Sequence, residues 1–154
     1  MIIPVVENNH GEFKEESIMN TFEKKWNHVA VEDCGSYMSK EAKSFVTAFK
    51  NMLKRELKDM GIEVVNIKPN HYDLSGMIKI NEKYLYINYN IPRWGEPIDF
   101  DQSGAVNGVL YRPAKHETDW HGGRNRFCSI RNLPASVRGI FNNTDAWSEV
   151  KNNR

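Results

Sequence analysis

The sequence predicts an α+β fold, a mostly antiparallel sheet of about four to five strands packed by one long helix, with flanking helices. Apolar residues recur at three- and four-residue steps over residues 40–60, which is the period of a helix with one buried face. After Gly61 the period changes to two, as in half-buried strands. The 154-residue length suits one hydrophobic core. We therefore expect a single domain over residues 1–141 and a polar C-terminal tail over 142–154.

Two helices are expected before the sheet and one after it. Apolar and aromatic residues at helical spacing predict the first helix over residues 12–29. In the long helix 40–60, Ser39 suits the N-cap and Gly61 suits the left-handed residue at the C-terminal end. A proline in the first turn begins the last helix, over residues 134–141.

Period-two segments predict the strands. They lie at residues 2–6, 62–68, 72–80, 83–90, 108–111 and 127–130. Asn81 and Glu82 suit the tight turn of a hairpin between two of these strands. Tyr84 and Tyr86 share the face of strand 83–90 opposite to its aliphatic residues. Either packing within the fold or a partner is expected to cover these tyrosines.

Composition limits the class of protein. An apolar content of 40%, a charged content of 27% and a formal net charge of +1 are typical of globular proteins. No apolar run approaches the roughly 20 residues of a membrane span, and the N-terminal run lacks the basic lead of a signal peptide. We therefore expect a cytoplasmic protein with no membrane partner, in which Cys34 and Cys128 are free thiols.

One segment, residues 108–138, is basic, with six Lys or Arg against two Asp or Glu. Its cations are Arg112, Lys115, Arg124, Arg126, Arg131 and Arg138. Arginine binds phosphate or carboxylate through a two-pronged fork that lysine lacks. The segment thus indicates an anionic partner, or else internal pairing with the acidic residues of 96–101. The latter lie in a long connection, 91–107, of a length that is often functional.

Residues that bind metals or transfer protons cluster in the loop after strand 108–111. His116, Asp119 and His121 are spaced His-x2-Asp-x-His, with His71 or Asp73 as a further ligand from another element. The alternative is that these side chains cap turns. Gly122 and Gly123 suit either an anion-binding nest or a tight turn. No phosphate-binding loop or dinucleotide fingerprint is present.

The order of several short motifs resembles a loose group of small proteins from phages and mobile elements of Gram-positive bacteria. The matching residues, which fall within a span of roughly residues 40–141, are His71, Tyr72, Ser75 and Gly76; Arg112, Ala114 and Lys115; Asp119 and Trp120; and Gly122, Gly123 and Asn125. The resemblance implies a mobile-element accessory protein, a class that includes anti-CRISPR inhibitors of bacterial immunity. It implies no catalytic residue.

The leading hypothesis is a non-enzymatic binder of a protein or nucleoprotein, with RNA or DNA as its nucleic-acid component, that inhibits a defence complex such as a CRISPR effector. It requires no cofactor. Its expected contacts are Arg112, Lys115, Trp120, Arg124 and Arg126, together with loop 91–107. One alternative is a metal-dependent phosphodiesterase or nuclease that uses His116, Asp119 and His121 with a divalent metal. Another is a structural or self-assembling accessory protein, a homo-oligomer that buries Tyr84 and Tyr86.

Overall fold

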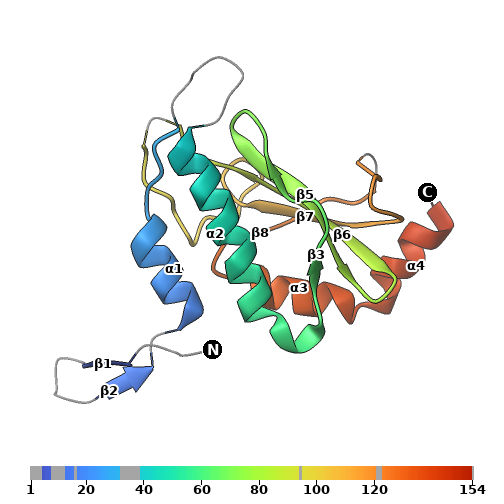
Figure 1. Cartoon of the computed structure of the whole chain (residues 1–154). Helices are drawn as coiled ribbons and strands as arrows, with labels where there is room; N and C mark the ends of the chain where they lie inside the picture. Colours follow the sequence, from blue (N-terminus) through green and yellow to red (C-terminus); the bar gives the residue numbers. More distant parts are fainter. Residues whose placement is uncertain are drawn as a thin grey trace.

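A computed structural model gives an α+β domain in which helices cover one face of an antiparallel sheet, which confirms the predicted fold class (Figure 1). It describes residues 5–7, 13–15, 17–31, 39–93, 95–120 and 123–153. The helices of this part of the chain are α1 (Ile18–Trp26), α2 (Lys40–Glu56), the 3-10 turn η1 (Lys58–Met60), α3 (Leu133–Phe141) and α4 (Thr144–Asn153).

Six strands form the main sheet. They are β3 (Glu63–Val64), β4 (Lys68–Pro69), β5 (Asp73–Ile80), β6 (Lys83–Asn90), β7 (Val109–Ala114) and β8 (Arg126–Cys128). Their order is β3-β5-β6-β7-β8, with β4 also paired to β5, and every pairing is antiparallel. Asn81, with a φ of 54°, turns β5 into β6 as predicted. A separate hairpin pairs β1 (Val5–Glu7) with β2 (Phe13–Glu15).

The single strand predicted over 62–68 is divided into β3 and β4, because the chain between them crosses over Gly76. A Cβ atom at Gly76 would lie 2.4 Å from the Asn66 carbonyl oxygen. The Asn66 side-chain oxygen accepts a hydrogen bond from the Met77 amide at 2.7 Å. The Met77 amide thus bonds to a side chain instead of a backbone carbonyl, and the edge strand is interrupted at this point.

The N-cap of the long helix is the one that the sequence predicts, since the Ser39 hydroxyl accepts from the Ala42 amide at 3.1 Å. The predicted C-terminal end at Gly61 is wrong for this helix: α2 ends at Glu56 with Leu57 as its C-cap, and Gly61, left-handed with a φ of 66°, caps the following turn η1. The first helix is shorter than predicted. It begins at Ile18, because the Ser17 hydroxyl caps the Asn20 amide at 3.0 Å, and residues 13–15 form a strand instead.

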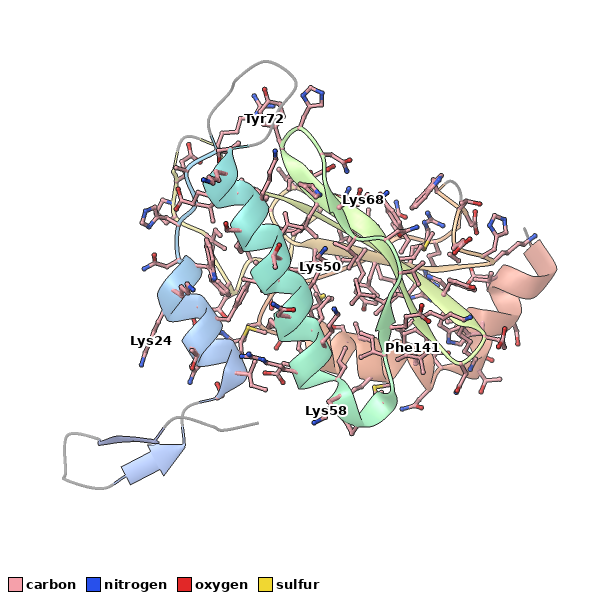
Figure 2. The ribbon with its side chains drawn as sticks, viewed as in Figure 1. Lys24, Lys50, Lys58, Lys68, Tyr72 and Phe141 are labelled. Atoms are coloured by element: carbon pink, nitrogen blue, oxygen red, sulfur yellow. The ribbon has the colours of Figure 1, made fainter. Side chains whose placement is uncertain are left out.

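Helices α1 and α2 lie side by side and bury an aromatic cluster against one face of the sheet (Figure 1). The ring of Phe22 contacts Phe45 and Phe100, while Phe49 is stacked on Tyr89 of β6 at 6.4 Å between ring centroids. The lysines of the outer helix surfaces, among them Lys24 and Lys58, are exposed (Figure 2). The aromatic residues of both helices therefore pack in the core, and their lysines lie on the solvent-facing surface.

The segment expected to be a polar tail instead contains α4. The ring of Trp147 is stacked on Phe141 at 5.1 Å, and its indole N–H donates to the Ile140 carbonyl oxygen at 2.8 Å. Ala146 and Val150, one turn apart, are also buried. The asparagines around this segment obscured its apolar stripe, which becomes evident only once α3 offers it a surface.

Candidate partner-binding surface

The sheet has a second face, opposite to α2, that the helices do not line. The register of β5, β6 and β7 places Met77, Tyr86 and Arg112 in one row on this face. The loop after β7 returns over this row, and Trp120 meets Tyr86 edge to face, at 6.1 Å and 74°. Trp120 remains 43% exposed. Trp120 is thus an exposed aromatic side chain that packs against the sheet.

Arg112 differs from the expected surface contact, because it is only 2% exposed. Its guanidinium carbon lies 5.0 Å from the centre of the Tyr86 ring, and one of its nitrogens donates to the Asp119 carbonyl oxygen at 3.2 Å. Such cation–π and charge-assisted contacts are strong where water is excluded. Arg112 therefore positions the loop rather than reaching a partner.

Further bonds fix the loop that Arg112 holds. The Asp119 carboxylate accepts from the Lys115 amide at 2.9 Å, and the Asn66 side chain donates to the Glu117 carbonyl oxygen at 3.3 Å. A ring nitrogen of His116 accepts from the Thr118 amide at 3.3 Å. Asp119 and His116 thus act as turn-capping side chains, which is the alternative that the sequence left open.

The residues of the metal-site hypothesis do not come together in the part of the chain that the structure describes. His121 and Gly122 lie outside the described residues, whereas Gly123 has a φ of 78°, as a tight turn requires. His71 and Asp73 line a cavity to which neither His116 nor Asp119 contributes. Among the described residues, no three His, Cys, Asp or Glu side chains are grouped so that they could hold a metal ion.

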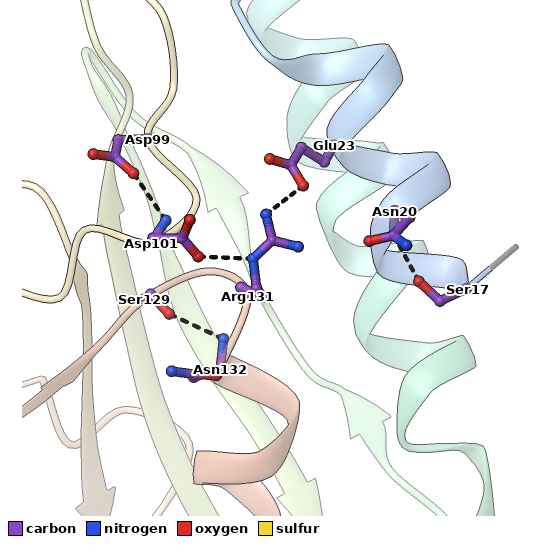
Figure 3. Close-up of polar contacts among 8 residues, drawn as sticks. All are labelled: Ser17, Asn20, Glu23, Asp99, Asp101, Ser129, Arg131 and Asn132. Atoms are coloured by element: carbon purple, nitrogen blue, oxygen red, sulfur yellow. Dashed lines mark hydrogen bonds and ion pairs between the residues drawn. The ribbon is translucent and has the colours of Figure 1, made fainter. Parts of the chain in front are cut away.

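Two of the six cations of segment 108–138 form internal ion pairs. Arg131, just before α3, bridges Glu23 of α1 and Asp101, the latter at 2.7 Å (Figure 3). Arg138 of α3 pairs with Asp59 at 2.7 Å, and this hydrogen-bonded guanidinium holds the pKa of Asp59 below its ordinary value. Arg131 therefore forms the predicted ion pair between segment 108–138 and the acidic residues of 96–101.

The remaining cations, Lys115, Arg124 and Arg126, have no described carboxylate within ion-pair distance. All three gather around α4. Arg124 and Arg126 line a cavity of about 300 Å³ with α4, and Lys115 lines a neighbouring one of about 420 Å³. Val150 of α4 borders both cavities. We define Lys115, Arg124 and Arg126 as the basic cluster.

Arg126 of the basic cluster and Trp120 belong to different faces of the sheet. In β8, Arg126 is paired with Tyr111, while Phe127 is paired with Leu110 and points to the opposite face. Phe127 is 37% exposed and shares the face of Tyr86 and Trp120. Phe127 was not predicted to lie at the surface, because an apolar residue in a short strand indicates the core.

Tyr84 and Tyr86 are half-buried. The Lys79 ammonium lies 5.3 Å from the centre of the Tyr84 ring, and Trp120 covers Tyr86. Their partial cover thus comes from the fold itself. Cys128 is a buried free thiol whose pKa is raised to about 11 by burial, while Cys34 lies outside the described residues.

No helix among the described residues is long and apolar enough to cross a membrane. Comparisons with models of protein families, with curated proteins and with solved structures found no match for this chain.

Proposed function

We propose that the protein is a non-enzymatic binder of a nucleoprotein, and that it contacts the nucleic-acid component through the basic cluster. One observation carries the proposal. Arg131 and Arg138 are ion-paired and Arg112 is buried, whereas Lys115, Arg124 and Arg126 are not paired with any described carboxylate. The Arg126 guanidinium donates to the Arg124 carbonyl oxygen at 3.4 Å, which leaves its charge without an acidic partner among the described residues. Unpaired arginines in a group suit phosphate oxygens, which their guanidinium forks bind through two hydrogen bonds.

The order of the loop supports this proposal. Arg112, Asn66 and the Asp119 carboxylate hold the loop between Lys115 and Trp120 by hydrogen bonds at 2.9–3.3 Å. A contact surface that is already ordered loses little conformational entropy when it binds. Trp120, exposed on the other side of the sheet, offers a ring on which an unpaired base could stack.

The side chains of the alternative nuclease site serve a different purpose. His116 and Asp119 accept hydrogen bonds from loop amides, which favours a role for both in shaping the loop. The further role of an accessory protein of a phage or mobile element, acting on a defence nucleoprotein such as a CRISPR effector, is part of our proposal. It rests on the sequence resemblance.

The test uses fluorescence anisotropy with a labelled single-stranded RNA and a DNA duplex, each of about 20 nucleotides, between about 50 and 200 mM salt. The variant is the double substitution Arg124→Ala/Arg126→Ala. We expect weaker binding and a smaller salt dependence, with the slope of log K against log salt reduced by about 1.4 for RNA if each arginine contacts one phosphate. The control is Lys43→Ala/Lys54→Ala, which removes the same charge from exposed positions of α2.

Equal affinity of the wild-type protein and the arginine variant, or equal losses in the variant and the control, would reject the basic cluster as the contact. Absence of binding to both nucleic acids would reject the proposed function. Cleavage of the RNA in the presence of Mn²⁺, lost in Asp119→Asn, would support the phosphodiesterase alternative instead.

A further inference from the structure

A large open cavity, of about 1020 Å³, lies at the end of the sheet where β5 begins and β6 ends. It is at the upper end of the range for small-ligand sites. Residues on its wall that matter for binding are Tyr72, Asp73, Tyr89, Arg93, Glu96 and Asp99. Neither Trp120 nor any residue of the basic cluster contributes to it, so it is a site separate from the one proposed above.

The charge of the cavity wall is negative. Three lining residues are acidic, namely Asp73, Glu96 and Asp99, and one is an arginine, Arg93. The register of β5 and β6 places Asp73 on the face of the sheet opposite to Tyr89. The Arg93 guanidinium carbon lies 3.8 Å from the centre of the Tyr72 ring, so this cation is stacked on the wall. An anionic ligand would meet a net repulsion here, and a cationic one a net attraction.

Two of the carboxylates are held in place. The Asp73 oxygens accept from the side-chain amides of Asn70, at 2.8 Å, and Asn88, at 3.1 Å. One Asp99 oxygen accepts from the Asp101 amide at 2.9 Å. Carboxylates that are already oriented lose less freedom when a donor approaches them.

The Tyr89 hydroxyl is a second and independent indication of a ligand. Tyr89 is 2% exposed, its ring is stacked on Phe49 in the core, and it lines the cavity. Its hydroxyl forms no hydrogen bond with any residue that the structure describes. The hydroxyl oxygen is not among the fully buried polar atoms that lack a partner in the described residues, so it is accessible from the cavity that it lines. Burial and the nearby charge of Asp99 raise the pKa of Tyr89, so the hydroxyl stays neutral and can accept a hydrogen bond from a ligand N–H.

The arrangement favours an extended ligand over a single ion. Within the described part of the chain, the carboxylates of the cavity do not form a group of three that could hold a metal ion. The volume of about 1020 Å³ is much larger than one side chain needs. We propose that this cavity binds a short basic peptide segment of a partner protein. Its arginine or lysine side chains meet Glu96 and Asp99, one of its N–H groups reaches the Tyr89 hydroxyl, and the segment continues around the end of the sheet to Asp73.

The test titrates the full chain with a fluorescent, acetylated hexapeptide of alternating arginine and glycine. The double variant Glu96→Gln/Asp99→Asn keeps side-chain size and the oxygen that accepts from Asp101, and it removes two charges. We expect its Kd to rise about tenfold or more. Tyr89→Phe removes only the hydroxyl and should raise the Kd about fivefold, with an unchanged salt dependence. The matched control, Glu63→Gln/Glu82→Gln, alters two exposed carboxylates outside the cavity and should leave the Kd unchanged.

Three results would overturn the proposal. They are the absence of peptide binding by the wild-type protein, an equal loss in the control pair, and equally strong binding of a hexapeptide of alternating glutamate and glycine. Melting curves of each variant verify that it is folded. Arg124→Ala/Arg126→Ala should bind the basic peptide as the wild-type protein does, so failure of this proposal and failure of the proposed function are distinguishable.

Discussion

Gly76→Ala is the substitution whose effect the structure specifies most directly. The added Cβ atom would lie 2.4 Å from the Asn66 carbonyl oxygen and 2.5 Å from the Ile67 Cα atom. Both neighbours belong to the backbone, which cannot rotate away as a flexible side chain would. Since ordinary contact begins at 3.4 Å, the two segments must separate by 3.4 − 2.4 = 1.0 Å.

That separation acts on the hydrogen bonds which join the crossing segment to β5. They run from the Val65 amide to the Met77 carbonyl oxygen, at 2.9 Å, and from the Met77 amide to the Asn66 side chain, at 2.7 Å. Losing one of them costs about 1 kcal/mol, and overpacking adds about 1–3 kcal/mol. We expect the free energy of unfolding to fall by roughly 2–4 kcal/mol, and therefore the melting temperature to fall by roughly 5–15 °C for a chain of this length.

Thermal and urea unfolding of Gly76→Ala measure this effect, with Gly139→Ala as the control. Gly139 is exposed in α3 and its added Cβ would meet nothing within 4 Å, so the control should be stabilised by about 0.5–1 kcal/mol through its higher helix propensity. A change in melting temperature below about 2 °C for Gly76→Ala, or similar losses in both variants, would refute the reasoning.

Two further predictions concern α4 and the buried thiol. Trp147→Ala removes the stacking on Phe141 and the bond to Ile140. It should therefore destabilise the protein by about 3 kcal/mol and speed hydrogen exchange in α4, whereas the exposed neighbour Ser148→Ala should not. Burial raises the pKa of Cys128 from 9.0 to about 11, so the unfolded thiol ionises first. The thiol's contribution to the free energy of unfolding therefore falls by roughly 2 kcal/mol as the pH rises from 9 to 11. Urea unfolding over this range should show a shallower decline in Cys128→Ala; identical profiles would contradict the assignment.

The fold class and the long helix were predictable because their signals are local. The Ser39 cap, the change from helical to alternating period after Gly61 and the hairpin turn at Asn81 each depend on neighbours a few residues away. The errors arose where another element of the fold supplied the partner. The helix α4 needs Phe141 and Ile140 of α3 beneath Trp147, and the interruption of the edge strand needs the contact between Asn66 and Gly76.

For the site, the residue types present were readable from the chain: arginines and a tryptophan in one segment, and acidic residues in the long connection. The use of each group depends on the folded structure, which left Trp120 exposed. It buried Arg112 beneath the loop, paired Arg131 and Arg138 with carboxylates of other elements, and placed Arg124 and Arg126 beside α4. The physical reason is that burial and ion pairing depend on groups far apart in the chain, whereas composition and periodicity report only what each segment can offer.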